Sequence, residues 1–160
     1  QRRVLYRVVQ LGDSKQRITT DDLPFIIADV LESNEYQHVI LTHCDLNSEW
    51  NQQAYADIEL EIDGKSYAAN GAGNGGFDAF TSAVNSILTE LGMQLPELLD
   101  YKVHIPRGGQ TSALTEASIT WQLDGKMKTT TTRGMHANQV FAAIEATLRL
   151  LNRLLHDRLQ

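Results

Sequence analysis

The sequence predicts an α+β fold in which one β-β-β-α unit is used twice, so that two antiparallel sheets are each covered by a helix. Three observations predict it. Asp63-Gly64-Lys65 recurs at an offset of 61 residues as Asp124-Gly125-Lys126. Apolar and polar residues alternate before each tripeptide, and apolar residues with helical spacing follow it. The repetition predicts pseudo-two-fold symmetry within the chain.

The alternation before each tripeptide has a period of two, which is typical of a half-buried strand. Its apolar positions are Ala56, Ile58, Leu60 and Ile62 in the first unit and Ala117, Ile119, Trp121 and Leu123 in the second. An Asp-Gly pair between two such runs predicts a β-hairpin, because both residues tolerate positive φ. An earlier strand fits each unit, at 39–44 in the first and at 101–105 in the second.

A glycine-bearing turn precedes a helical pattern in each unit. The apolar stripes are Phe80, Val84, Ile87, Leu88 and Leu91 in the first helix and Val140, Ile144, Leu148, Leu151 and Leu155 in the second. Asn74 and Asn138 stand just before these helices. Since an Asn side chain accepts a hydrogen bond from the first helical turn, both are predicted to be helix caps.

Residues 1–35 are predicted to form a helical linker subdomain ahead of the main domain at 36–160, whose repeat units span about 36–95 and 96–160. The basic segment 1–17 contains Val4, Leu5, Val8 and Val9, and we interpret it as the end of a helix that begins before residue 1. Thr19 or Thr20 is expected to cap a second helix. Its inward-facing residues would be Leu23, Ile26, Ile27, Val30 and Leu31.

Composition narrows the class of protein. The 160 residues are 42% hydrophobic and 21% charged, which suits one domain with a substantial core. The net charge of −6 argues against nucleic acid or an anionic membrane as a partner. No apolar run approaches the roughly 20 residues of a spanning helix. The single cysteine, Cys44, suits a cytoplasmic location, and we interpret it as a small buried strand residue.

The segment Gly71-Ala72-Gly73-Asn74-Gly75-Gly76 matches the G-x-G-x-x-G pattern of dinucleotide-binding turns. That fingerprint needs a buried parallel strand before it and an acidic residue at the end of the next strand. The preceding strands instead form a hairpin with a charged outer face, so we reject this interpretation. A glycine turn that leads into a helix still suits an anion such as a carboxylate, and the alternative is a tight turn without a ligand.

Catalytic and metal-binding patterns are weak. The chain has no H-x-H pair and no G-x-S-x-G turn. His38 and His43 are five positions apart, which would place them on opposite faces of a strand. No catalytic residue, metal ligand or cofactor site is therefore predicted in this chain.

Several short motifs together resemble the C-terminal regulatory domain of the 2-isopropylmalate synthase family, which includes citramalate synthase. The resemblance covers nearly the whole chain. Its motifs are Gly73-Asn74-Gly75-Gly76-Phe77-Asp78-Ala79, Leu99-Asp100-Tyr101, Gly108-Gly109, Arg133-Gly134 and Leu151-Asn152-Arg153-Leu154. The chain departs from the family's common pattern at Gly76 and Ala137, where many members have Pro.

The resemblance implies a homodimer of β-β-β-α pairs that binds a branched-chain amino acid between the two units as a feedback inhibitor. The positions that would contact this effector are Gly73, Asn74, Gly75, Phe77, Leu98, Tyr101, Ile105, Ser112, Met135, Ala137 and Gln139. Tyr101, Leu98 and Ile105 have an alternative interpretation as core or interface residues.

The resemblance also implies a cytoplasmic acyltransferase whose catalytic barrel, with a divalent metal, precedes residue 1. The expected effector is leucine, which would inhibit the condensation of acetyl-CoA with 2-oxoisovalerate in leucine biosynthesis. Isoleucine and a citramalate synthase are the first alternative. A dimerisation scaffold without ligand and a nucleotide-binding enzyme are the others. The helix at 1–10 and the helix at 19–31 are the expected route of transmission to the barrel.

Overall fold

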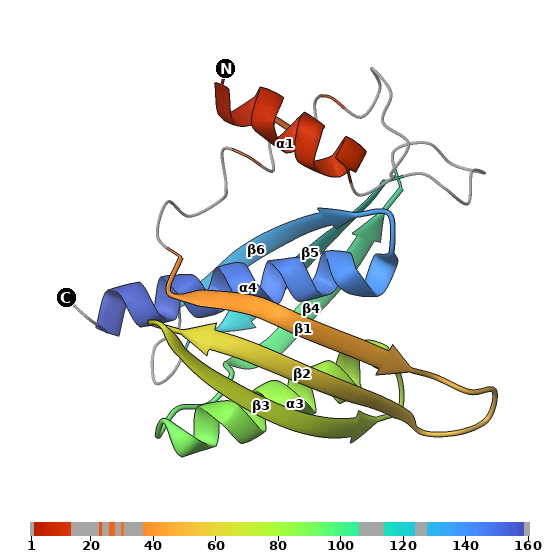
Figure 1. The fold of residues 1–160 in the computed structure, drawn as a ribbon, viewed down its shortest axis with the longest axis vertical. Helices are drawn as coiled ribbons and strands as arrows, with labels where there is room; N and C mark the ends of the chain where they lie inside the picture. The colour runs from red at the N-terminus through yellow and green to blue at the C-terminus, as the bar shows by residue number, and fades with distance from the viewer. Residues whose placement is uncertain are drawn as a thin grey trace. The chain divides into compact units, whose positions relative to one another are not determined.

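A computed structural model describes residues 2–13, 23, 26, 27, 30, 37–105, 114–123 and 128–158. The chain divides into two compact units (Figure 1). One comprises residues 35–97 and 150–160, and the other comprises residues 1–34 and 98–149. Each contains a three-stranded antiparallel sheet followed in the chain by a helix, so the predicted duplicated α+β fold is confirmed.

The first sheet has the order β1-β2-β3, with β1 at Val39–Asn47, β2 at Ala54–Ile62 and β3 at Lys65–Gly73. Helix α3 (Gly76–Glu90) covers one face of it (Figure 1). The period of two is visible along β2, where every second residue from Ala54 to Ile62 is buried. The predicted helical stripe is also confirmed, since Phe80, Val84, Ile87 and Leu88 are buried.

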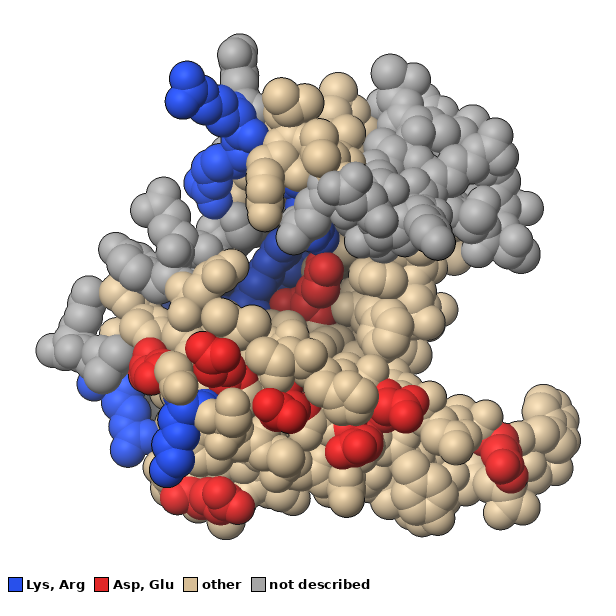
Figure 2. All heavy atoms as spheres, viewed as in Figure 1, with Lys and Arg blue, Asp and Glu red and all other residues tan. Residues whose placement is uncertain are grey.

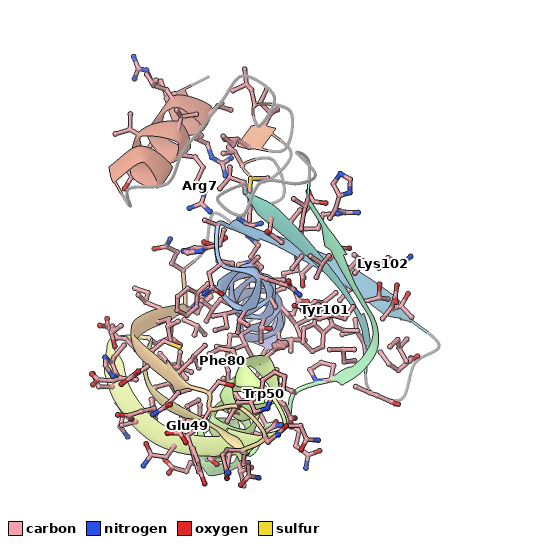
Figure 3. The ribbon with its side chains drawn as sticks, turned by 90° about the vertical axis from the view of Figure 1, so that its right-hand side faces the viewer. Arg7, Glu49, Trp50, Phe80, Tyr101 and Lys102 are labelled. Atoms are coloured by element: carbon pink, nitrogen blue, oxygen red, sulfur yellow. The ribbon has the colours of Figure 1, made fainter. Side chains whose placement is uncertain are left out.

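The opposite face of the first sheet is acidic. Asp57, Glu59 and Glu61 alternate with the buried residues of β2. Asp45 of β1 pairs with Asp57 of β2. Figure 2 shows acidic side chains gathered over these strands. At the end of the β1–β2 hairpin, Trp50 is 90% exposed and lies beside Glu49 (Figure 3).

The second sheet has the order β4-β5-β6, with β4 at Glu97–His104, β5 at Thr115–Gln122 and β6 at Thr129–His136. Ile119 and Trp121 are buried, and the Trp121 indole N–H donates to the Thr132 hydroxyl at 3.0 Å. Helix α4 (Gln139–Arg158) follows β6, and Ile144, Leu151 and Leu155 of its predicted stripe are buried.

The two hairpins differ in length. In the first, Asp63 (φ 49°) and Gly64 (φ 84°) form the predicted two-residue turn, and Ile62 pairs with Lys65. In the second, the N–H of Leu123 donates to the C=O of Lys128, which leaves four residues between them. Residues 124–127 lie outside the described residues. The expectation of one constant offset is therefore wrong: Ala56 and Ala117 are equivalent at an offset of 61, whereas Gly71 and Gly134 are equivalent at 63.

Gly71 and Gly134 bring each helix close to its sheet. A Cβ on Gly71 would lie 2.5 Å from the Ala83 nitrogen, and a Cβ on Gly134 would lie 2.7 Å from the Ala146 nitrogen. Real Cβ atoms do not approach backbone so closely. The first glycine of the G-x-G-x-x-G match is thus needed for helix packing, and the antiparallel strand before it excludes the dinucleotide fingerprint.

At the N-terminus, α1 (Arg2–Asp13) confirms the predicted first helix. Residues 23, 26, 27 and 30 are helical, whereas Thr19, Thr20 and Leu31 lie outside the described residues. Ile26 and Val30 are buried, but Leu23 and Ile27 are 39% and 38% exposed, so the expectation that all face inward is wrong for these two. For Ile27 the reason is the helical period, since it is rotated by about 100° from Ile26 around the helix. Leu23 is seven positions before Val30 and lies on nearly the same side, so the helical period does not explain its exposure.

Candidate functional site

The first candidate turn joins β3 to α3. Gly73, its first residue, is buried, and a Cβ there would lie 2.5 Å from the Asp78 carboxylate and 2.7 Å from the Ala79 nitrogen. The Asp78 carboxylate accepts the backbone N–H of Asn74 at 2.9 Å. Gly73 thus leaves room for Asp78 to fold back over the turn, and Asp78 is a site residue that sequence reasoning missed. The sequence feature that could have identified Asp78 is its position as an acidic residue in the first turn of a helix.

Gly75 is the N-cap of α3, and its C=O accepts the first helical hydrogen bond from Ala79 at 2.9 Å. The predicted capping role of Asn74 is wrong, because α3 begins one residue too late for the Asn74 side chain to reach the first turn. Glycine has no side chain with which to cap, and a Cβ at Gly75 would meet nothing within 4 Å. The first-turn N–H groups of a helix and the positive end of its dipole favour an anion. This turn therefore has the physical properties of a carboxylate site.

Phe77 lies in the first turn of α3 and is half-buried. Its ring stacks on that of Phe80, with 6.3 Å between the centroids. Because Phe80 is fully buried, Phe77 connects the turn to the apolar core beneath α3. Gly73, Asn74, Gly75 and Phe77 are thus brought together at one helix N-terminus, as expected.

Strand β4 carries the next candidates. Tyr101 and Lys102 leave β4 on opposite sides (Figure 3). Tyr101 is half-buried, and burial raises the pKa of its hydroxyl above the usual value. Leu98, 41% exposed, is three positions from Tyr101, an odd spacing that places it on the other face. Ile105 follows the end of β4 and is 46% exposed.

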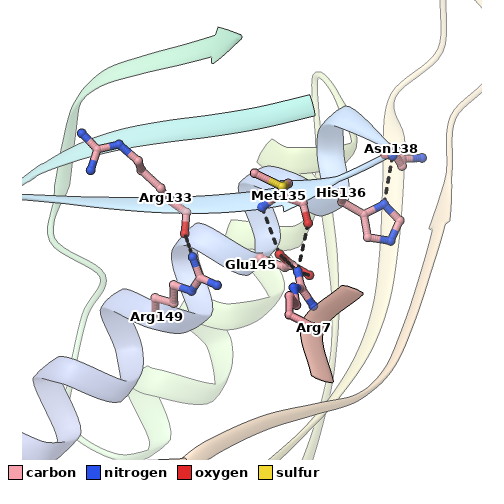
Figure 4. Close-up of polar contacts among 7 residues, drawn as sticks. All are labelled: Arg7, Arg133, Met135, His136, Asn138, Glu145 and Arg149. Atoms are coloured by element: carbon pink, nitrogen blue, oxygen red, sulfur yellow. Dashed lines mark hydrogen bonds and ion pairs between the residues drawn. The ribbon is translucent and has the colours of Figure 1, made fainter. Parts of the chain in front are cut away.

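The second candidate turn joins β6 to α4 and has a different hydrogen-bond pattern (Figure 4). The Asn138 side chain accepts the N–H groups of Val140 at 2.9 Å and Phe141 at 3.2 Å, so its predicted role as a cap is confirmed. The His136 ring nitrogen Nδ1 lies 2.9 Å from the Asn138 N–H, which donates to it. The N-cap residue of α3, Gly75, thus makes no side-chain cap bond, whereas the N-cap residue of α4, Asn138, bonds two N–H groups of the first turn.

The candidates at this second turn have unequal exposure. Met135 is 1% exposed and packs in a core cluster, whereas Ala137 is half-buried and Gln139, the first residue of α4, is exposed. Ala137 and Gln139 are therefore the side chains that a ligand at this turn would meet. Ser112 lies outside the described residues, as do Gly108 and Gly109.

The electrostatics of the second turn come from three groups. Burial lowers the pKa of His136 below its ordinary value, and the Arg7 guanidinium also lowers it, while Glu145 opposes the shift. The Asn138 N–H donates to Nδ1 of His136, and only a neutral imidazole has a ring nitrogen that can accept such a bond. This turn thus includes one imidazole whose pKa is held below its ordinary value, which favours its neutral form.

The described part of the chain offers little support for a metal-binding site or for a nucleophilic cysteine. No group of three or more His, Cys, Asp or Glu residues among the described residues is arranged to hold a metal ion. Cys44 is half-buried on β1, less than expected, and burial raises the pKa of its thiol. A raised pKa leaves little thiolate at neutral pH, so Cys44 is a poor nucleophile.

The two β-β-β-α units place this chain in the class of α+β domains built by internal duplication. The chain matches the LeuA allosteric (dimerisation) domain family over residues 17–155, and it belongs to that family. The resemblance stated from the motifs is confirmed.

Curated relatives carry two names. The chain is 31% identical over 155 residues to a protein of Methanosphaerula palustris, and 29% identical over 151 residues to one of Archaeoglobus fulgidus, both provisionally named (R)-citramalate synthase CimA. It is 28% identical over 152 residues to the 2-isopropylmalate synthase of Aquifex aeolicus. These matches cover 97%, 94% and 94% of this chain but only 30%, 30% and 28% of the relatives. Within the described residues, no helix is both long and apolar enough to cross a membrane.

Proposed function

We propose that this chain is the feedback-regulatory domain of a 2-isopropylmalate synthase, and that it binds leucine. Bound leucine would inhibit the acetyl-CoA-dependent condensation with 2-oxoisovalerate in an attached catalytic domain, and the domain would act as a homodimer. Membership of the LeuA allosteric (dimerisation) domain family and the relative named 2-isopropylmalate synthase support this proposal.

The β3–α3 turn is the observation that carries the proposal. A free amino acid has a carboxylate and an ammonium group, and the turn offers a partner for each. The uncapped helix N-terminus at Gly75 suits the carboxylate. The Asp78 carboxylate, 2.9 Å from the Asn74 nitrogen, would repel a simple anion but attract the ammonium group. The turn thus favours a zwitterion over a dianion or an inorganic phosphate.

Isoleucine is the second candidate effector, with a citramalate synthase as the parent enzyme. The names of the relatives from Archaeoglobus and Methanosphaerula support it. Leucine and isoleucine differ in the position of one methyl branch, which an apolar pocket discriminates by about 1–3 kcal/mol. The polar contacts at Gly75 and Asp78 are the same for both amino acids, so the choice depends on the apolar contacts.

Calorimetric titration of the chain with leucine and then isoleucine tests the proposal. Gly75→Asp and Gly75→Asn are a matched pair, because they add side chains of equal size that differ in charge. Both residues are favoured at an N-cap, and the space around Gly75 is open, so both variants should fold. We expect the Asp variant to lose at least tenfold more affinity than the Asn variant, because its carboxylate repels that of the ligand.

The outcomes separate the alternatives. Tighter binding of leucine supports a 2-isopropylmalate synthase as the parent, and tighter binding of isoleucine supports a citramalate synthase. If neither amino acid binds but the chain sediments as a dimer, the dimerisation scaffold is the correct interpretation. Unchanged affinity in both variants would show that the ligand does not use this turn, because either side chain would cap the N–H groups proposed to bind the carboxylate, and the turn would be dropped as the carboxylate site.

A further inference from the structure

Met135, at the end of β6, connects the second turn to the N-terminal helices through its side chain. It packs in a buried cluster with Ile26 and Leu114. Val4 and Val8 of α1, both partly buried, pack against the same cluster. The Met135 side chain, two positions before Ala137, is therefore in the same apolar core as α1.

The backbone of Met135 is bonded to α1 and α4 at the same place (Figure 4). Its N–H donates to Glu145 Oε2 at 3.0 Å, and its C=O accepts from the Arg7 guanidinium at 3.2 Å. The same Arg7 nitrogen lies 3.1 Å and 3.0 Å from the two oxygens of Glu145. Arg7, Met135 and Glu145 thus form a closed ring of polar contacts that joins α1, β6 and α4.

The Arg7–Glu145 ion pair is poorly exposed to solvent. The side chains of Arg7 and Glu145 are 16% and 26% exposed, so water and salt screen this pair less than a surface pair. Loss of either partner would leave the other charge partly buried without its counter-ion. A shift of the Met135 backbone would strain the contacts that hold α1.

The first repeat lacks this arrangement. At the offset of 63 that relates Gly71 to Gly134, the positions of Met135 and Glu145 are taken by Ala72 and Ser82. Ser82 has no carboxylate and is exposed. The ring is therefore not a requirement of the β-β-β-α fold, which the first unit forms without it.

We propose that Glu145 is a positioning residue that couples the β6–α4 turn to α1, so that an amino acid bound at this turn changes the docking of α1. This inference rests on the proposed function for the effector, and it adds a contact between an effector molecule and the β6–α4 turn that the proposed function does not require. The side chains that would meet the effector, Ala137 and Gln139, lie two and four positions from Met135. Movement of the turn is passed to α1 through the Met135 backbone, Glu145 and Arg7.

Hydrogen exchange of the α1 amides, with and without saturating amino acid, tests this on the unmodified chain. We expect the bound amino acid to change the exchange rates of residues 2–9 at least tenfold. In Glu145→Gln and Arg7→Met, we expect that change to fall below threefold, while calorimetry still detects binding. Glu90→Gln removes an equal charge from an exposed position on α3 and should respond like the unmodified chain.

The outcomes distinguish this inference from the proposed function. If neither leucine nor isoleucine binds the unmodified chain, the proposed function and this inference both fail. If leucine or isoleucine binds but leaves the hydrogen-exchange rates of the α1 amides unchanged, only this inference fails, whatever the variants show. If Glu145→Gln responds fully, coupling does not pass through Glu145. The full polypeptide adds a second readout, since its Glu145→Gln variant should bind the effector but lose most of the inhibition.

Discussion

The side chain of Asn152 pairs with both backbone polar groups of Val39, 113 positions earlier in the chain. Its Oδ1 accepts the Val39 N–H at 2.9 Å, and its Nδ2 donates to the Val39 C=O at 3.3 Å. The His38 N–H donates to the same Oδ1 at 2.6 Å. The Asn152 amide thus bonds to the start of an edge strand as a neighbouring strand would.

Asn152→Ala should lower the free energy of unfolding by about 2–4 kcal/mol, because it leaves three backbone groups near β1 without their partner. Asn152 is only 8% exposed, so water cannot readily replace the amide. Asn85→Ala is the matched control, since Asn85 accepts the Leu95 N–H at an exposed site and should cost less than about 1 kcal/mol. Urea unfolding measures both. Equal costs would show that the Asn152 contacts are not held in solution.

Gly71→Ala and Gly134→Ala should each destabilise the chain by at least about 2 kcal/mol, because the new methyl group would overlap the helix backbone. Gly75→Ala places the same methyl group in open space at an extended φ of −152° and should cost about 1 kcal/mol or less. Thermal unfolding of the three variants compares them directly. A Gly134→Ala variant as stable as Gly75→Ala would contradict the close approach of α4 to β6.

Asn138→Ala should cost about 1 kcal/mol, because the N–H groups of Val140 and Phe141 lose their cap. Asn74→Ala should lower the free energy of unfolding by only about a few tenths of a kcal/mol. The reason is that the contact of Asn74 with Asp78 uses the backbone N–H, which alanine retains. The sequence predicts a helix cap at both asparagines, whereas the structure has a side-chain cap only at Asn138. Unequal costs of the two substitutions are therefore expected from the structure and not from the sequence. Circular dichroism during urea unfolding gives both values, and a larger cost at Asn74 would reverse the assignment.

His136 should make the stability depend on pH. Burial lowers its folded-state pKa below 6.5, so the unfolded chain binds the proton first as the pH falls. Its contribution to stability is complete above about pH 6.5, declines below that value and stops declining once the pH is below the folded pKa. Protonation also removes the Nδ1 acceptor used by the Asn138 N–H.

We therefore expect the unmodified chain to lose stability relative to His136→Asn between pH 7 and pH 5, because asparagine does not titrate there. Imidazole proton shifts in an NMR titration locate the folded pKa independently. A titration midpoint above 6.5, or parallel stability curves for the two proteins, would contradict the burial of a neutral His136.

Much of the fold follows from local patterns. The alternation from Ala56 to Ile62 predicted one buried face of a strand, and Asp63-Gly64 predicted a turn with positive φ. Both features could be predicted because each depends only on residues that are neighbours in the sequence. The stripe from Phe80 to Leu88 follows for the same reason. The effector positions from Gly73 to Phe77 were predictable in part, since a glycine turn before a helix is visible in the sequence. Their contact with a ligand stays a prediction.

Other features depend on where distant segments meet. A repeated tripeptide predicts a repeat but not the two extra residues that shift the offset from 61 to 63 and make Gly75, not Asn74, the partner of Asn138. Met135 has the sequence signature of any apolar strand residue, and its burial against Ile26 comes from packing across more than 100 positions.

The duplicated β-β-β-α units could be predicted from the amino-acid sequence, because residues a few positions apart set the periods of strands and helices. The contacts of Asn152 with Val39 and of Arg7 with Glu145, pairs 113 and 138 positions apart, became visible only in the folded chain. A buried hydrogen bond or ion pair needs two groups at one place. Which groups meet depends on how the elements pack, and no local pattern contains that information.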